Sequence, residues 1–275
     1  MAHTYDTGVT SAKSNGDPKT FNHTCGAGAT VLTLMLVIGG GTARTGGAPT
    51  YNSVAMTQAD AARQAASSPE TTVEMWYLLD PPTGSAYAIS IPNTGAVYIT
   101  ARTASFKAAA GSKTRLLSAD YATGTSTNPT GPTHTGLRFG DVQVAVLGYG
   151  DDSASATSSG TSLYRTDEGT YVSASQYSIF ATGNAFLMWT DATSEDWAIV
   201  SAVFTEYADV AADTVNVSKA IGYAVVMPPD GVNVSKAVGY AVLSPPSGVN
   251  VSKVVAYAVL APPAVVEAAP LIFIF

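Results

Sequence analysis

Cysteine, histidine and charge are all scarce in this sequence. The 275 residues include one cysteine and three histidines, and only 12% are charged, about half the usual share for a soluble domain. A single cysteine excludes an intrachain disulfide. The net charge is −7 and the 13 basic residues are scattered, which argues against nucleic-acid binding, because phosphate recognition needs a clustered positive surface.

Sequence motifs of catalysis and cofactor binding are also missing. The chain contains no GxGxxG, P-loop, HExxH or GxSxG pattern. His3, His23 and His134 lie far apart and without the spacing of metal ligands, so no metal site is expected. We interpret Cys25 as a small buried residue and not as a nucleophile, because no Asn or Asp partner can be identified. We therefore expect a protein that is not an enzyme and uses no cofactor.

Hydrophobic runs long enough to cross a membrane are absent as well. The run Val31–Ile38 is too short for a membrane helix, and three prolines and Glu267 interrupt the apolar stretch Val254–Phe275. The first residues lack the basic and apolar regions of a signal peptide. We expect no membrane-spanning segment.

The residues that are present favour β-structure. Hydrophobic residues make up 46% of the chain, enough for a sizeable core. Short strand-like runs alternate with Gly, Pro, Ser and Thr between residues 21 and 208, which predicts an all-β antiparallel sandwich of two layers. The expected strands are 31–38, 72–79, 87–91, 96–105, 142–149, 185–189 and 197–204. Residues 1–20 are expected to form a leading strand or arm, and Met56–Ala66 has the propensity of a helix but is equally compatible with a loop.

Alternation of side chains along these strands predicts the core. Its members are expected to be Leu32, Leu34, Leu36, Trp76, Leu78, Val144, Val146, Leu187, Trp197, Ile199 and Val203. We expect the three tryptophans, Trp189 included, to pack in the core, with a sugar-binding role as the alternative. The acidic pairs 151–152 and 195–196 are interpreted as solvated loop residues, with a calcium site as the alternative.

After residue 208 the sequence becomes repetitive. A segment beginning at Val215 recurs almost unchanged from Val232 and from Val249, which gives a period of 17 residues. Pro-Pro-Asp-Gly and Pro-Pro-Ser-Gly separate the copies, as expected of turns. The organisation predicted is therefore an N-terminal arm (1–20), a sandwich (21–208) and a repetitive β-strand stalk (209–275) with a hydrophobic C-terminus.

The alternation within each copy predicts self-association. If each copy forms one strand, three such strands present an apolar face and a small-residue face that a single chain cannot bury together. We expect an intertwined homo-oligomer, a trimer, in preference to a monomeric three-stranded meander. The expected contact residues are Val217, Ile221, Tyr223, Val234, Val238, Tyr240, Val251, Val255 and Tyr257. The terminal residues Leu271, Ile272, Phe273, Ile274 and Phe275 are expected to cap the stalk or anchor it in a partner.

Four segments carry a resemblance to a known family. They are Phe21-Asn22-His23-Thr24-Cys25, Tyr51-Asn52-Ser53-Val54-Ala55-Met56, residues 75–84 (MWYLLDPPTG) and residues 193–199 (TSEDWAI). In order and spacing the region 21–206 resembles a jelly-roll sandwich family of bacterial surface proteins and phage virion proteins. The resemblance implies a lectin-like or laminin-G-like fold without catalytic residues. The repeats are similar to those at the ends of phage structural proteins.

These features together predict a non-enzymatic structural protein on the exterior of a bacteriophage virion, as a decoration protein or tail fibre on the capsid or tail. Its expected partners are other virion proteins and host-surface glycans, which the loops Thr123–Gly136 and Asp151–Thr161 would contact. The alternative is a bacterial cell-surface adhesin or extracellular matrix protein.

Overall fold

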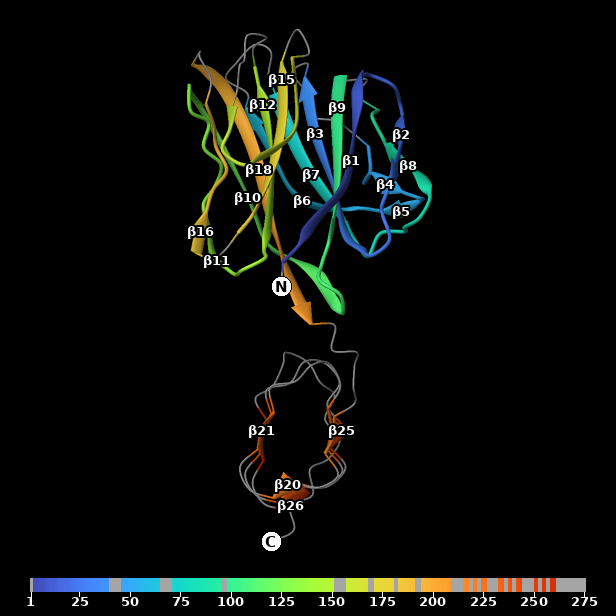
Figure 1. Cartoon of the computed structure of the whole chain (residues 1–275), viewed down its shortest axis with the longest axis vertical. Coiled ribbons are helices and arrows are strands. Elements are labelled where there is room, and N and C mark those ends of the chain that lie inside the picture. The colour runs from blue at the N-terminus through green and yellow to red at the C-terminus, as the bar shows by residue number, and fades with distance from the viewer. Residues whose placement is uncertain are drawn as a thin grey trace. The chain divides into compact units, whose positions relative to one another are not determined.

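Figure 1 shows the computed structural model of the chain. The structure describes residues 2–39, 46–64, 71–94, 98–150, 157–167, 171–180, 183–190 and 194–208, and short strands at 215–217, 220–221, 224–226, 232–234, 237–238, 241–243, 250–251, 254–255 and 258–260. All elements among these residues are strands. The chain divides into two compact units, Met1–Ala208 and Asp209–Phe275, and each unit is described by itself.

Two five-stranded antiparallel sheets form the first unit (Figure 1). The first sheet has the order β1 (Thr4–Ser14), β9 (Tyr98–Lys107), β3 (Ala29–Gly39), β7 (Thr71–Leu79) and β6 (Thr57–Gln64). The second has the order β10 (Ser112–Ser126), β18 (Glu195–Ala208), β12 (Val142–Tyr149), β15 (Val172–Ile179) and β14 (Thr161–Asp167). The prediction of an all-β fold with antiparallel sheets is therefore confirmed.

Buried apolar side chains fill the space between the two sheets. Met35 and Val37 of β3 belong to one cluster with Val144 and Val146 of β12 and Phe204 of β18, and each is at most 1% exposed. Alternating residues of β3, β12 and β18 supply much of this cluster, as the pleat of a strand requires.

A third layer covers the other face of the first sheet, so the prediction of two layers is wrong. The strands β2 (Lys19–Thr24), β8 (Ala86–Ile91), β4 (Thr50–Tyr51) and β5 (Val54–Ala55) form this small sheet. Leu32, Leu34 and Leu36 of β3 pack here with Ile89 and Ile91 of β8. The residues predicted for the core are buried, apart from the partly buried Leu78, but they divide between faces. Both faces of β3 are covered, which explains its apolar run Val31–Ile38, interrupted by Thr33 alone.

The outer face of the second sheet is also covered. The pair β11 (His134–Leu137) with β16 (Gly183–Ala185) and the pair β13 (Thr157–Ser158) with β17 (Trp189–Thr190) form short ladders. Leu187, Trp189 and Trp197 are buried in one cluster on this side with Tyr149. The strand expected at 185–189 is therefore wrong, because β16 ends at Ala185 and β17 begins at Trp189 with a different partner.

Two further segments differ from expectation. The helix or loop predicted at Met56–Ala66 is instead the strand β6, whose Ala62 is buried in the core while Gln58 and Arg63 are exposed. The loop expected at Thr123–Gly136 begins inside β10, the longest strand described. Both strands lie at the outside of their sheets, where exposed polar residues replace the apolar pattern.

The second unit consists of parallel ladders between the three copies of the repeat. Each copy supplies three short strands: β19 (Val215–Val217), β20 (Ala220–Ile221) and β21 (Ala224–Val226), then β22 (Val232–Val234), β23 (Ala237–Val238) and β24 (Ala241–Leu243), then β25 (Asn250–Val251), β26 (Val254–Val255) and β27 (Ala258–Leu260). Each pair that these ladders form joins residues 17 positions apart in the sequence. This is the pairing of a parallel β-solenoid with 17 residues per coil. The continuous strand expected for each copy is wrong, and so is the meander.

Candidate functional site

The three histidines and the cysteine are buried, and among the described residues they form no metal-binding cluster. His3, His23 and His134 are 1%, 1% and 4% exposed. Within the described ranges no group of three or more His, Cys, Asp or Glu side chains could hold a metal ion. Cys25 is fully buried, as expected, and burial raises the pKa of its thiol, which disfavours the thiolate that a nucleophile requires.

Two of the tryptophans and Asp196 form hydrogen bonds within the fold. Trp76 and Trp197 are buried and donate their indole N–H groups to Glu74 Oε2 at 2.8 Å and to Ser126 Oγ at 3.0 Å. Asp196, at the beginning of β18, accepts a hydrogen bond from the Thr125 hydroxyl of β10. The pair 151–152 and most of the loop Asp151–Thr161 lie outside the described residues.

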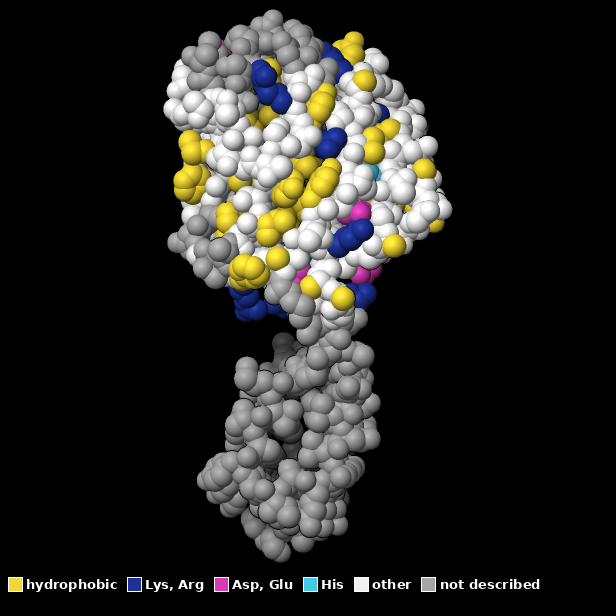
Figure 2. Space-filling view, in the orientation of Figure 1, with side chains coloured by type: hydrophobic (Ala, Val, Ile, Leu, Met, Phe, Trp, Pro, Cys, Tyr) yellow, Lys and Arg dark blue, Asp and Glu magenta, His cyan; other side chains and the backbone are white. Residues whose placement is uncertain are grey.

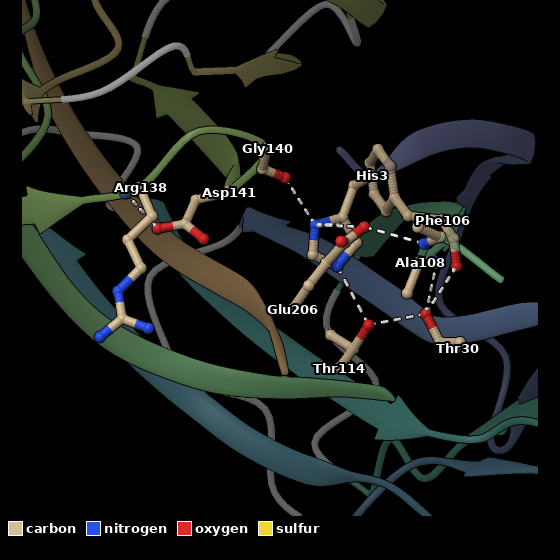
Figure 3. A network of polar contacts seen from close by, with 10 residues as sticks. His3, Thr30, Phe106, Ala108, Thr114, Arg138, Gly140, Asp141 and Glu206 are labelled. Atoms are coloured by element: carbon tan, nitrogen blue, oxygen red, sulfur yellow. Dashed lines mark hydrogen bonds and ion pairs between the residues drawn. The ribbon is translucent and has the colours of Figure 1, made fainter. Parts of the chain in front are cut away.

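A buried polar network holds the N-terminal strand in place (Figure 3). The His3 Nδ1–H donates to the Gly140 carbonyl at 2.8 Å, which leaves Nε2 of the neutral ring as an acceptor, 3.0 Å from Thr114 Oγ1. The Thr114 hydroxyl lies 2.6 Å from that of Thr30, which also accepts the Ala108 N–H at 3.0 Å. The network therefore joins the beginnings of β1, β3 and β10.

The charged groups around His3 are Glu206 of β18 and Asp141, which directly precedes β12. Glu206 Oε1 lies 4.0 Å from His3 Nδ1 and accepts the Ala109 N–H at 2.9 Å. Burial lowers the pKa of His3, although the hydrogen bond to Gly140 and the charges of Glu206 and Asp141 act in the opposite direction. At neutral pH the ring is therefore an uncharged structural group, and nothing in the sequence of residues 1–20 indicated its role.

A second polar cluster ties β1 to the chain that precedes β3. Asp6 accepts hydrogen bonds from Gly26 N at 2.7 Å and Ser105 Oγ at 2.8 Å, and Lys107 Nζ lies 2.9 Å from its carboxylate. Burial raises the pKa of Asp6, but these donors outweigh it and lower the pKa below its usual value. Burial also lowers the pKa of His23, which interacts electrostatically with Asp6, to about 4. The network around His3 and the cluster around Asp6 both stabilise the fold.

The residues predicted for self-association lie in register where the structure describes them. Val217 pairs with Val234 and Val234 with Val251, and the same holds for the series Ile221, Val238 and Val255. Asn216, Asn233 and Asn250 form a third such series. Tyr223, Tyr240, Tyr257 and the terminal segment Leu271–Phe275 lie outside the described residues.

A parallel stack of this kind leaves strand edges at both ends. Within the described part of the unit, β19, β20 and β21 pair on one side only, and so do β25, β26 and β27. Backbone groups along an unpaired edge are ready to bond to another strand, so stacks of repeats need end capping or a partner.

Comparison with known proteins finds no matching family model, no similar curated protein and no similar solved structure. Among the described residues, no helix is long and apolar enough to span a membrane.

Proposed function

We propose that this chain is a structural protein on the exterior of a bacteriophage particle. Residues 1–208 would form a jelly-roll head displayed outward, and residues 209–275 would form a stalk that joins copies of the chain to one another and to other virion proteins. The protein would carry out no catalysis and need no cofactor.

The in-register stacking of the 17-residue copies is the observation that supports this proposal most. Residues of equal position, such as Asn216, Asn233 and Asn250, pair along the stack. An element of this kind lengthens by whole coils without altering its cross-section, which suits a spacer or fibre. Within the described part of the unit, the strands of the first and third copies pair on one side only, and such edges favour association with further strands.

We still propose a trimer, but one formed by contacts between separate stacks and not by interleaved strands. Strand pairing along the stack is already satisfied within one chain, so interleaving of strands from three chains is not required. Side-by-side association of three solenoids through their apolar positions would give the same stoichiometry.

Immunogold electron microscopy of the phage whose genome encodes this chain tests the proposal. Antibodies raised against residues 1–208 should label intact, purified particles at regular sites, and mass spectrometry should detect the chain at a stoichiometry comparable to other particle proteins. Label confined to the surface of uninfected bacterial cells would contradict the proposal and support a bacterial adhesin or matrix protein.

A further inference from the structure

A stacked aromatic pair, half-exposed at Tyr5 and half-buried at Tyr177, joins β1 of the first sheet to β15 of the second. The ring of Tyr5, which is 36% exposed, stacks on that of Tyr177 with centroids 5.4 Å apart and an interplanar angle of 10°. Phe106 of β9 packs edge-on against both rings. Figure 2 shows a band of hydrophobic side chains crossing this face of the head. The buried ring of Phe106 thus supports the stacked pair from below the surface.

The guanidinium of Arg102 lies beside this pair without an acidic partner. Its Nη1 donates to Thr10 Oγ1 at 2.6 Å, and Nη2 lies 3.5 Å from the Tyr5 hydroxyl. The Nε–H is buried and has no acceptor, and no carboxylate of the described residues forms an ion pair with Arg102. The nearest acid in sequence to Tyr5, Asp6, is already bonded to Lys107.

Gly8 has no side chain, which leaves room for the Tyr5 hydroxyl and the Arg102 guanidinium beside its Cα. A Cβ at Gly8 would lie 2.6 Å from Arg102 Nη2 and 2.7 Å from the Tyr5 hydroxyl. Any other residue at this position would push the two side chains apart. We call Tyr5, Gly8, Thr10, Arg102 and Tyr177 together the Tyr5–Arg102 surface.

We propose that the Tyr5–Arg102 surface binds an acidic sugar residue of a glycan. The flat C–H face of a pyranose ring packs on an exposed aromatic ring, and a carboxylate is the acceptor that matches the fork of a guanidinium. Binding a carboxylate would supply Arg102 with a charge partner, which the described residues do not provide there. The site differs from the two loops that the sequence indicated.

The overall charge restricts the ligand further. A protein with a net charge of −7 repels densely charged polyanions at long range, whereas a glycan with one isolated carboxylate experiences little repulsion. The expected ligand is therefore a glycan that ends in a single acidic sugar. This inference deepens the proposed display function. Glycan binding itself depends on the head alone, so a finding that phage particles lack the chain would not contradict it.

Titration of the full chain with sialyllactose, lactose and heparin fragments tests the proposal. We expect saturable binding of sialyllactose with a dissociation constant on the order of 1 mM, about fivefold or more tighter than for lactose or heparin fragments. Saturation-transfer NMR should show contacts from the ring protons of the acidic sugar.

Three variants locate the site. Arg102→Gln should abolish the preference for sialyllactose over lactose, and Tyr5→Leu should weaken the binding of both. The matched control is Arg115→Gln, because Arg115 is an exposed arginine beside another aromatic ring, that of Tyr207 at 5.8 Å, but it has no stacked ring pair. Arg115→Gln should leave binding unchanged, and thermal melting should show that all three variants are folded.

Four results would overturn the proposal. They are no saturable binding up to about 10 mM, equal binding of lactose and sialyllactose, a preference for heparin fragments, and a preference for sialyllactose that survives in Arg102→Gln. If Arg102→Gln unfolds the chain, Arg102→Lys is tested in its place. An Arg102→Lys variant that keeps the full preference for sialyllactose over lactose would contradict bidentate recognition.

Discussion

Nε2 of His3 lies 3.0 Å from Oγ1 of Thr114, which joins residues 111 positions apart in the sequence. This contact and the bond from His3 Nδ1 to the Gly140 carbonyl attach the beginning of β1 to the second sheet. A strand that pairs on one side only would otherwise separate from its sheet at its free end.

His3→Ala should therefore loosen β1 without unfolding the head. We expect a loss of stability of about 1–3 kcal/mol, because the buried Thr114 hydroxyl and Gly140 carbonyl lose a partner. Hydrogen exchange of the β1 amides should accelerate at least tenfold while exchange in β12 stays unchanged. His134→Ala is the matched control, since its ring bonds to Ser118 and Ser201 and not to β1. Unchanged exchange in β1 of His3→Ala would refute this role.

Leu34→Ala and Met35→Ala should both destabilise the head, because neighbouring residues of β3 face different covered layers. Leu34 packs toward β8 and Met35 toward β12, and both are at most 1% exposed. Truncation of either side chain should cost about 2–5 kcal/mol in urea unfolding, compared with little change for the exposed Thr83→Ala. A small effect in Leu34→Ala alone would mean that the third layer does not cover β3.

The stability of the head should fall as the pH drops below neutral. The pKa of His23 is 6.5 in the unfolded chain and about 4 in the folded head, so the unfolded state takes up the proton first. This residue contributes stability that is present above about pH 6.5 and lost toward pH 4, about 2 kcal/mol of it between pH 7.5 and 5. The lowered pKa values of His3 and His134 act in the same direction.

Urea midpoints at several pH values in His23→Gln measure this contribution. The variant should show a flatter pH dependence than the parent protein. An identical slope in both proteins would mean that His23 does not titrate as the structure requires.

Deletion of residues 232–248 should leave the repeat unit intact, because it removes one whole coil and preserves the offset of 17. Deletion of nine residues, 232–240, should destroy the unit, since strands of unequal position would then face each other. Hydrogen exchange should show protected amides in the remaining copies of the first variant and none in the second. Equal protection in both variants would exclude the 17-residue register.

Much of the sandwich could be predicted because buried strands have a distinctive composition. The strand predicted at 142–149 is the observed β12, since both of its faces are buried and Gln143 is the one strongly polar residue in its run. Strands with a polar face, such as β6 and β10, have no such signal, and their place is set by pairing with distant strands. Gly39, the last residue of β3, has no side chain because the ring of Tyr171 lies where its Cβ would be, 2.3 Å away.

The candidate sites were harder to predict because their residues come from strands that are distant in the sequence. The Tyr5–Arg102 surface draws on β1, β9 and β15, which are adjacent only in the folded head. In the repeats, the period of 17 was plain in the sequence, but alternation of side chains is the same for one long strand and for three short ones. Only the pairing of equal positions distinguishes the solenoid from the expected strands.

Light-scattering mass tests most directly whether residues 209–275 bring copies of the chain together. The full chain should have three times its monomer mass of 28.1 kDa, and a chain ending at Ala208 should be a folded monomer. Monomeric mass for both proteins at the same concentration would contradict the account.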